Sequence, residues 1–137
     1  MAVKFDPILD KLREKDTDTD VESFIVAASD ETTDLTVGDG KVYFVMPYAF
    51  TVTEVKASVN TAPVGSALTV QVTDDGDGNN ITTSAISIAA AAKLGTTTDI
   101  AAGAIAEDSI IGVNIDQIGS GTAGTGLKVA ILGYQTV

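Results

Sequence analysis

Short runs in which apolar and polar residues alternate are the feature that most constrains how this chain folds. The run SIIGVNIDQI at 109–118 places Ile111, Val113 and Ile115 on one face, and LKVAILGY at 127–134 repeats the pattern. Alternation with a period of two predicts β-strands that bury one face, and the Gly, Asp, Asn and Thr residues between the runs indicate turns. The same pattern predicts strands at 21–28, 35–46, 50–59, 68–72 and 81–89. Short strands at this spacing predict an all-β chain that folds as an antiparallel β-sandwich of jelly-roll or immunoglobulin-like type.

The run that begins at Phe50 changes phase partway along. Phe50 and Val52 share one face, Glu54 interrupts, and Val55 and Ala57 continue the apolar pattern on residues of the opposite parity. A slip of one residue moves every later side chain to the other face of the strand unless an extra residue is absorbed. We therefore expect a β-bulge here, or a strand that changes sheets.

The segments between the runs carry turn chemistry. The stretch PYAFTVTEVKASVNTAPVGSALTVQV, from 47 to 72, is interpreted as a β-hairpin with its turn at 61–65, because Pro presets φ and Gly tolerates a positive φ. The GDG at 38–40 indicates a tight turn that splits its run. The segment IAAAAKLG is expected to cross between sheets as an irregular loop or edge strand. The composition of GSGTAGTG, at 119–126, is that of a flexible, solvated loop.

The composition limits the size of the core. The length of 137 residues is typical of one domain, and the hydrophobic residues include few aromatic ones, which make up 5% of the chain. We expect a thin core made mainly of Ala, Val and Ile. Because a thin core supplies little net stability against chain entropy, association of identical subunits is a common remedy. The sequence therefore predicts an oligomer.

Charge and residue types argue against most chemistries. The chain has no His and no Cys, which removes the commonest general base, thiol nucleophiles and disulfides. The net charge of −11 disfavours contact with a phosphate backbone. A pair of glycosidase carboxylates would normally be accompanied by sugar-stacking aromatics, and Trp is absent. No Lys-Ser/Thr follows the glycines of GSGTAGTG, as a phosphate-binding loop would require. We expect no catalytic residue, no cofactor and no direct partner among nucleic acids.

The acidic segment TDDGDGNNI partly matches a calcium-binding loop. Asp75, Asp77 and Asn79 have the spacing of the first ligands of an EF-hand. The sixth and twelfth positions of such a loop should be Gly and Glu, but they are Asn and Ile here. We interpret the segment as a polar hairpin turn without metal. A weaker calcium site formed by Asp74, Asp75 and Asp77 is the alternative.

Residues 1–20 differ from the remainder and are interpreted as an extended or short-helical arm before the β-sandwich domain at 21–137. The arm has an apolar stripe flanked by basic side chains, which suits docking onto a partner; a frayed, solvated terminus is the alternative. The residues predicted to contact the partner are Phe5, Ile8, Leu9, Leu12 and Arg13. Neither a cleaved signal nor a membrane-spanning segment is expected, because no apolar run is long and continuous enough.

Three segments together resemble a known group of proteins. They are KFDPILDKLREKD at 4–16, the stretch from 47 to 72 quoted above, and SIIGVNIDQIGSGTAGTGLKVAILGY at 109–134. The combination is similar to small virion proteins of tailed bacteriophages and to domains of longer phage fibre proteins. The resemblance implies a virion component built on a β-sandwich, commonly trimeric, that is made in the host cytoplasm and incorporated into the phage particle.

The 137 residues contain no long stalk or coiled coil, which favours the head over the tail fibre within this resemblance. A head decoration (cement) protein binds folded shell proteins and stabilises them by mass action, so it needs surfaces and no catalytic group. The expected partners are the major capsid protein or another virion protein, together with two further copies in a homotrimer, and no membrane. The alternative is a tail-fibre module that binds a receptor or glycan through its loop tips.

Overall fold

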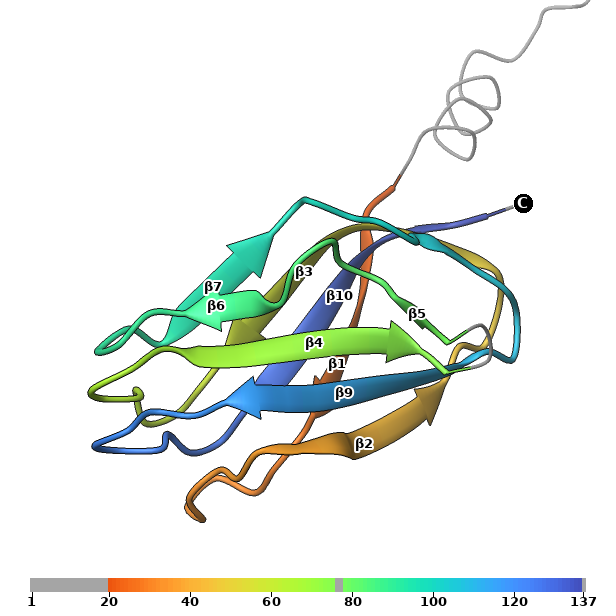
Figure 1. Cartoon of the computed structure of the whole chain (residues 1–137). Helices are drawn as coiled ribbons and strands as arrows, with labels where there is room; N and C mark the ends of the chain where they lie inside the picture. Colours follow the sequence, from red (N-terminus) through yellow and green to blue (C-terminus); the bar gives the residue numbers. More distant parts are fainter. Residues whose placement is uncertain (1–19, 76–77, 137) are drawn as a thin grey trace, which may run out of the picture.

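The computed structural model describes residues 20–75 and 78–136, and within these ranges the chain forms strands, turns and loops without a helix. The predicted all-β class is therefore confirmed. Among the described residues, no helix exists that could span a membrane. The strands labelled in Figure 1 and their companions are β1 (Glu22–Ala27), β2 (Gly38–Val45), β3 (Phe50–Ser58), β4 (Leu68–Asp74), β5 (Asn79–Asn80), β6 (Ile86–Ile88), β7 (Leu94–Thr97), β8 (Ala104–Ile105), β9 (Ile110–Gln117) and β10 (Lys128–Gln135).

The strands form two antiparallel sheets that stack as a sandwich, as Figure 1 shows. The β1 sheet has the order β1-β10-β3-β7, with β8 also beside β3, and the β2 sheet has the order β2-β9-β4-β5, with β6 also beside β4. The pairings are nested: β1 with β10, β2 with β9, β3 with β7 and β8, and β4 with β5 and β6. Such nesting is that of one long antiparallel hairpin rolled into two sheets, which is the jelly-roll arrangement. Of the two sandwich types predicted, the structure has the jelly roll.

The bulge expected in the run from Phe50 is present in β3. Leu132 of β10 pairs with Glu54 and Gly133 pairs with Val52, so the intervening Thr53 is an extra residue. This insertion keeps the apolar side chains on the inner face despite their change of parity. The buried side chains of β3 are Phe50, Val52, Val55 and Ala57.

The hairpin predicted for 47–72 is wrong, because β3 and β4 belong to different sheets. Strands on either side of a sandwich core both bury one face, so alternation alone does not distinguish two paired strands from two opposed ones. The connection between them is held elsewhere: Thr61 forms a bridge to Thr125, and Val64 forms a bridge to Thr122. The chain thus crosses the end of the sandwich instead of turning back within one sheet.

The segment GSGTAGTG at 119–126 is packed, which contradicts the prediction of a solvated loop. Thr125 is only 7% exposed, and the amide of Leu35 donates to the carbonyl oxygen of Gly124 at 3.0 Å. A Cβ at Gly119 would lie 1.9 Å from a backbone oxygen of the same segment. Gly-rich composition suits a flexible linker and close backbone packing equally well, and here the glycines permit close approach.

The tight turn predicted at 38–40 is also wrong as stated, because these residues lie within β2. The register of β2 against β9 shifts between Gly38 and Val42, which is an irregularity of one strand and not a reversal of the chain. Gly40 has a φ of 62°, and its amide donates to Oδ1 of Asn114 at 2.8 Å. The glycines that suggested a turn therefore permit an irregularity within the strand, where Gly40 adopts a positive φ.

The strand predicted at 81–89 is shorter in the structure. Only Ile86–Ile88 forms a strand in the second half of this run, and Ile81 is buried before it. The chain then crosses from the β2 sheet to the β1 sheet, where β7 begins at Leu94. The expectation that IAAAAKLG crosses between sheets is confirmed.

The core lies between the two sheets and consists mainly of Val and Ile, as the composition predicted, but the Ala expected with them is nearly absent: only Ala28 and Ala57 are in the described buried set. The described buried set contains seven Val and seven Ile residues, but only one Phe. Phe50, Met46 and Leu68 are among its largest members. Because β-branched side chains have few rotamers and suit a pleated surface, the strands supply both the walls and the filling of the sandwich.

Candidate protein-binding surface

Exposed apolar side chains are concentrated along the edge strands β1 and β2, which we call the β1–β2 side, with one group on the outer face of each sheet. Among the described residues, eight large hydrophobic side chains are exposed, and six of them lie on or beside these strands. The six are Val21, Ile25, Val37, Tyr43, Val45 and Ile110. Single exposed apolar residues are normal on a protein surface, but a cluster of them is typical of an interaction site. The β1–β2 side is therefore the best candidate for a functional surface.

Tyr43 is the centre of the patch on the β2 sheet. Its side chain is 52% exposed, and its ring lies against two glycines: a Cβ at Gly40 would meet the hydroxyl at 2.3 Å, and a Cβ at Gly112 would meet the ring at 2.9 Å. Beside it, Val45 pairs directly with Ile110 across β2 and β9. The glycines leave room for the ring to lie flat along the sheet, so Tyr43 presents a broad apolar surface with a polar tip. Tyr in such a setting is a frequent anchor of protein interfaces.

The patch on the β1 sheet is centred on Ile25, which is 70% exposed. Ile25 lies opposite Ala130 of β10, and Val21 precedes the strand with 68% exposure. β1 is also the first strand after the predicted arm.

Four aromatic rings hold β1 and β2 together inside the sandwich. The ring of Phe24 from β1 is stacked against that of Phe44 from β2, with centroids 6.4 Å apart, and meets Phe50 edge to face at 5.0 Å. Tyr48 completes the cluster, with its centroid 6.0 Å from that of Phe24. Aromatic pairs at these distances stabilise a fold beyond the area that they bury. The exposed surface outside thus rests on a well-packed inner layer.

Tyr48 also fixes the start of β1 through a polar contact. Its hydroxyl donates a short hydrogen bond to the Glu22 carboxylate, the first residue of β1. This hydrogen bond, followed by burial and by the negative charge of Glu22, raises the pKa of Tyr48 above its usual 10.0. The phenol therefore stays protonated at physiological pH and can keep donating to Glu22. The point where the predicted arm would join the sandwich is anchored to the aromatic cluster.

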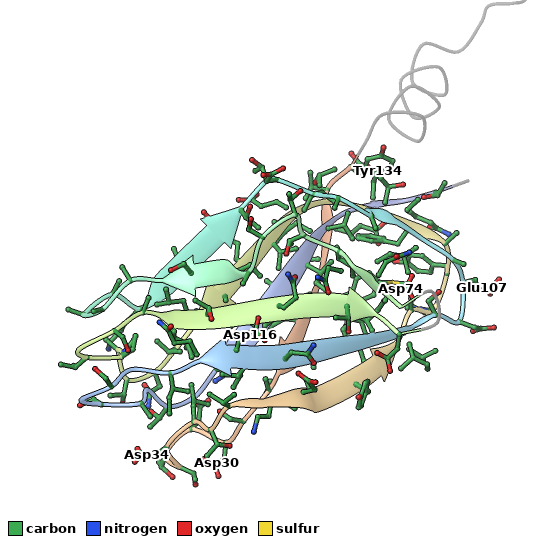
Figure 2. All side chains as sticks on the ribbon, viewed as in Figure 1. Asp30, Asp34, Asp74, Glu107, Asp116 and Tyr134 are labelled. Carbon is green, nitrogen blue, oxygen red and sulfur yellow. The ribbon has the colours of Figure 1, made fainter. Side chains whose placement is uncertain are left out.

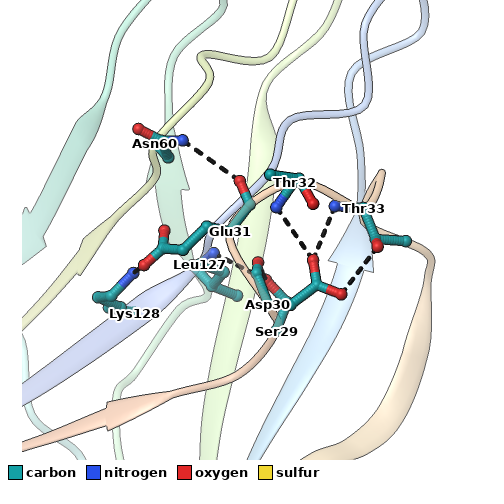
Figure 3. A network of polar contacts seen from close by, with 8 residues as sticks. All are labelled: Ser29, Asp30, Glu31, Thr32, Thr33, Asn60, Leu127 and Lys128. Atoms are coloured by element: carbon teal, nitrogen blue, oxygen red, sulfur yellow. Dashed lines mark hydrogen bonds and ion pairs between the residues drawn. The ribbon is translucent and has the colours of Figure 1, made fainter.

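The described acidic residues labelled in Figure 2 lie mainly at the two ends of the sandwich, Asp30 and Asp34 at one end and Asp74 and Glu107 at the other. At the first end, Oδ1 of Asp30 accepts hydrogen bonds from the amides of Thr32 at 3.0 Å and Thr33 at 2.7 Å (Figure 3). These bonds, those from Thr33 first, hold the pKa of Asp30 below its usual 3.8. The carboxylate therefore accepts hydrogen bonds from its own loop and stabilises the conformation of that loop.

A second set of contacts joins this loop to β10 and to the connection after β3. Glu31 forms an ion pair with Lys128, and its carbonyl oxygen accepts from Nδ2 of Asn60 at 3.2 Å, as Figure 3 shows. The hydroxyl of Ser29 accepts from the amide of Leu127 at 3.0 Å. An exposed ion pair contributes little to stability, so the loop is held mainly by the hydrogen bonds.

A pocket of about 190 Å³ lies beside this loop. Its lining consists of Ala28, Ser29, Asp30, Thr33, Asp34, Leu35, Thr36, Lys41 and Ile115. Several of its polar groups already bind one another: Asp30 binds Thr33, and Nζ of Lys41 donates to the hydroxyl of Thr36 at 2.7 Å. The pocket offers few uncommitted polar groups, and we assign it no ligand.

The alternative metal site at Asp74, Asp75 and Asp77 is only partly described. Asp77 lies outside the described residues, and Asp74 is 2% exposed at the end of β4. The carbonyl oxygen of Asp74 accepts from the amide of Gly78 at 2.8 Å, as in a tight turn. In the ranges 20–75 and 78–136, no group of three or more acidic side chains is arranged to hold a metal ion.

The arm residues predicted to bind a partner lie outside the described residues, so that prediction stays open. They are Phe5, Ile8, Leu9, Leu12 and Arg13. The surface on β1 and β2 was not predicted from the sequence. A signal for it exists, because the run VYFV at 42–45 is apolar on both faces, although a strand of a two-layer sandwich needs only one apolar face.

Comparisons with known proteins find no matching family and no matching curated protein. Solved structures of mixed types share the arrangement only distantly. The Drosophila NLP core, described for pentamer formation and histone binding, is 12% identical with a TM-score of 0.42, over 86% of this chain and 99% of that one. The Aeromonas sobria serine protease, solved with its chaperone, is 7% identical with a TM-score of 0.48, over 91% of this chain and 29% of that one.

A viral protein is among these structures as well. The VP2 subviral particle of infectious bursal disease virus is 11% identical with a TM-score of 0.45, over 84% of this chain and 33% of that one. This chain thus spans about a third or less of the protease and VP2 chains. At such identities and TM-scores, none of these similarities bears on function.

Proposed function

We propose that this chain is a non-enzymatic structural protein of a phage virion, and specifically a head decoration (cement) protein. It binds the major capsid protein or another virion protein through the β1–β2 side and the arm that precedes it. Bound to the folded shell and not to its dissociated subunits, it stabilises the shell by mass action. The sequence resemblance to small phage virion proteins supports the setting, and the surface supports the mode of action.

The observation that carries the proposal is the concentration of exposed apolar side chains on the edge strands β1 and β2, the first two strands after the arm in the sequence. Six of the eight exposed large hydrophobic residues described lie on or beside β1 and β2. Burying them against a partner would remove apolar area from water, at about 25 cal/mol per Å². Tyr43 supplies the kind of broad, rigid side chain that dominates binding energy in protein interfaces. The jelly roll holds this surface in place.

A reconstitution experiment tests the proposal. Particles made without this protein are incubated with the purified full-length chain, and the occupied positions are located by cryo-electron microscopy. We expect density on the head shell, with the β1–β2 side facing a shell protein. The double variant Tyr43→Ser and Val45→Ser should lose occupancy. The control is Leu94→Ser, which changes a similarly exposed residue on β7, an edge strand of the other sheet, and should bind normally.

Two outcomes would contradict the proposal. Density at the tail would instead indicate the fibre or receptor-binding role. Head density that leaves Tyr43 and Val45 facing solvent would show that another surface makes the contact.

A further inference from the structure

The four sheet edges of the sandwich differ in how well they are protected against pairing with another strand. The edges opposite β1 and β2 are broken into short pieces, with β5 and β6 in one sheet and β7 and β8 in the other. β2 has an irregular register between Gly38 and Val42, and it carries Lys41. Short strands, bulges and edge lysines are the devices by which β-proteins avoid edge-to-edge association. Three of the four described edges therefore have such protection.

β1 has none of these devices. Its register with β10 is continuous over six residues, from Glu22 opposite Gly133 to Ala27 opposite Lys128. Its sequence, ESFIVA, contains no Pro, Gly or Lys. Its outward side chain at the centre, Ile25, is the most exposed large hydrophobic residue described. A regular apolar edge of this kind is suited to pairing with a further strand.

The backbone groups on the free side of β1 are unpaired within the described structure. The amide of Ala28 donates to the carbonyl oxygen of Leu127, so the amides of even-numbered residues along β1 face β10. Those of Ser23, Ile25 and Ala27 therefore face away from the sheet. In the described ranges, no other strand pairs with this side of β1. Three residues thus offer a donor and an acceptor each to an incoming strand.

We infer that β1 pairs in an antiparallel manner with β1 of a second copy, about a two-fold axis that places Ile25 opposite Ile25 of that copy. Odd-numbered residues must face odd-numbered residues, because only these carry the free backbone groups. Only then do the outer faces of the two β1 sheets also lie on the same side. Among such registers, this one pairs all three residues that have free backbone groups, overlaps five of the six residues of each strand, and places the most exposed side chain against itself. It also places Ser23 opposite Ala27 of the second copy. The result is one continuous sheet through two jelly rolls.

The charge around β1 favours a second copy despite the acidity of the chain. The whole chain has a net charge of −11, but the strands of the β1 sheet carry only Glu22, Glu54, Lys56 and Lys128, which balance. Glu22 is also engaged by Tyr48. The paired residues 23–27 therefore place no like charges opposite each other, and the acidic residues that flank β1, Asp20 and Asp30, approach each other only at the ends of the pairing. Because the remaining charge repels over a longer range, added salt should strengthen the pairing.

This pairing does not require the proposed function, but both use β1, so in a paired copy the shell contact would fall to Tyr43 and Val45 on β2. It is compatible with the expected trimer. A two-fold contact uses only one edge of the molecule, so trimers formed through other surfaces would be joined in pairs. A short edge contact buries little area and should be weak in dilute solution. Copies held close together on a particle would pair more readily because their effective concentration is higher.

Single cysteines test both the pairing and its register, because the chain has no Cys of its own. Residues in a hydrogen-bonded antiparallel pair have Cα atoms about 5.5 Å apart, within the range that a disulfide can bridge. With oxidised glutathione, full-length Ile25→Cys should form a disulfide-linked dimer on a non-reducing gel. Ser23→Cys and Ala27→Cys should each stay monomeric alone and cross-link when mixed. A failure of Ile25→Cys to cross-link at high protein concentration would overturn the pairing, and a dimer from Ser23→Cys alone would overturn the register.

Variants that block the β1 edge provide a second measurement, one that does not depend on disulfide formation. Ile25→Lys places like charges opposite each other, and it should raise the dissociation constant of the pair more than about tenfold in sedimentation velocity. Leu94→Lys is the matched control, because Leu94 is 56% exposed on the other edge of the same sheet. It should change the constant by less than about twofold. Equal effects of the two variants would overturn the inference, as would a protein that is monomeric alone and pairs only with a strand of a shell protein.

Discussion

The hydroxyl of Tyr48 donates a hydrogen bond to the carboxylate of Glu22, which joins the loop before β3 to the first residue of β1. Through Tyr48, the start of β1 is connected to the aromatic cluster of Phe24, Phe44 and Phe50. The same strand carries the exposed Ile25 and follows the predicted arm. One contact therefore positions the part of the molecule for which we propose both binding and pairing.

The Tyr48–Glu22 contact predicts a loss of stability in alkali. Because the folded-state pKa of Tyr48 is raised above 10.0, its contribution to the free energy of unfolding is fully present below pH 10. The contribution is lost as the pH rises through the raised pKa. Urea unfolding of the wild type and Tyr48→Phe should differ at pH 8 and converge above pH 10. Tyr134→Phe is the control, and a difference that persists in strong alkali would contradict the prediction.

Asp30 predicts the opposite pH dependence. Its folded-state pKa is held below 3.8 by the hydrogen bonds from Thr33 and Thr32, so its contribution to stability is present above that pH. The contribution is lost as the pH falls through the lowered pKa. Asp30→Ala should be less stable than the wild type at pH 7, and the difference should shrink in acid. Asp34→Ala, which removes the carboxylate of an exposed neighbour, is the control variant.

The packed segment at 119–126 predicts that two nearby glycines respond differently to the same substitution. A Cβ at Gly119 would clash with backbone atoms, whereas a Cβ at Gly121 would lie at an ordinary contact distance, 3.4 Å from the oxygen of Val64. Gly119→Ala should lower the free energy of unfolding by about 1 to 3 kcal/mol. Gly121→Ala should leave it nearly unchanged. Equal, small effects in thermal unfolding would indicate that the segment is a solvated loop after all.

Phe50 should be the most sensitive residue of the core. It is fully buried, it is the only Phe in the described buried set, and its ring meets Phe24 edge to face at 5.0 Å. Phe50→Ala should lower the free energy of unfolding by about 3 to 5 kcal/mol, since the small core has little capacity to collapse around the cavity. The comparison is Tyr43→Ala, which removes a half-exposed ring from the surface. Similar losses for both in chemical denaturation would contradict the assignment of Phe50 to the core.

Deletion of residues 1–16 should separate folding from attachment. All the described strands begin at or after Glu22, so the truncated chain should keep its far-ultraviolet circular dichroism and melting temperature. Attachment to particles should be lost, because Phe5, Ile8, Leu9 and Leu12 supply the apolar anchors of the proposed contact. Particles that retain the truncated protein at full occupancy would show that the sandwich alone makes the contact.

The inner faces of the strands could be predicted from the sequence, because burial of one face imposes alternation. Even the extra residue in β3 was visible as a change of phase at Glu54. The assignment of strands to sheets was not visible. β3 and β4 show the pattern of a hairpin, yet they lie on opposite sides of the core, and only contacts such as that between Thr61 and Thr125 decide the path.

The candidate surface was less predictable than the fold for a physical reason. A sequence pattern reports which residues are apolar, and a surface site requires knowing which apolar residues find no neighbour. In VYFV, Val42 and Phe44 pack against the core while Tyr43 and Val45 do not. Ile25 is exposed only because β1 is at an edge of its sheet. Both facts depend on the order of the strands, which alternation does not encode.

The position of the two chain ends has a mechanical consequence. Glu22 at the start of β1 lies beside Gly133 near the end of β10, so both ends of the described chain leave from the same end of the β1 sheet (Figure 1). Tension between these two ends would unzip β1 from β10 one hydrogen bond at a time, which needs little force. Tension between the start of β1 and the opposite end of the sandwich would load all those bonds together in shear. The resistance of the molecule to pulling is therefore set by where its second point of attachment lies.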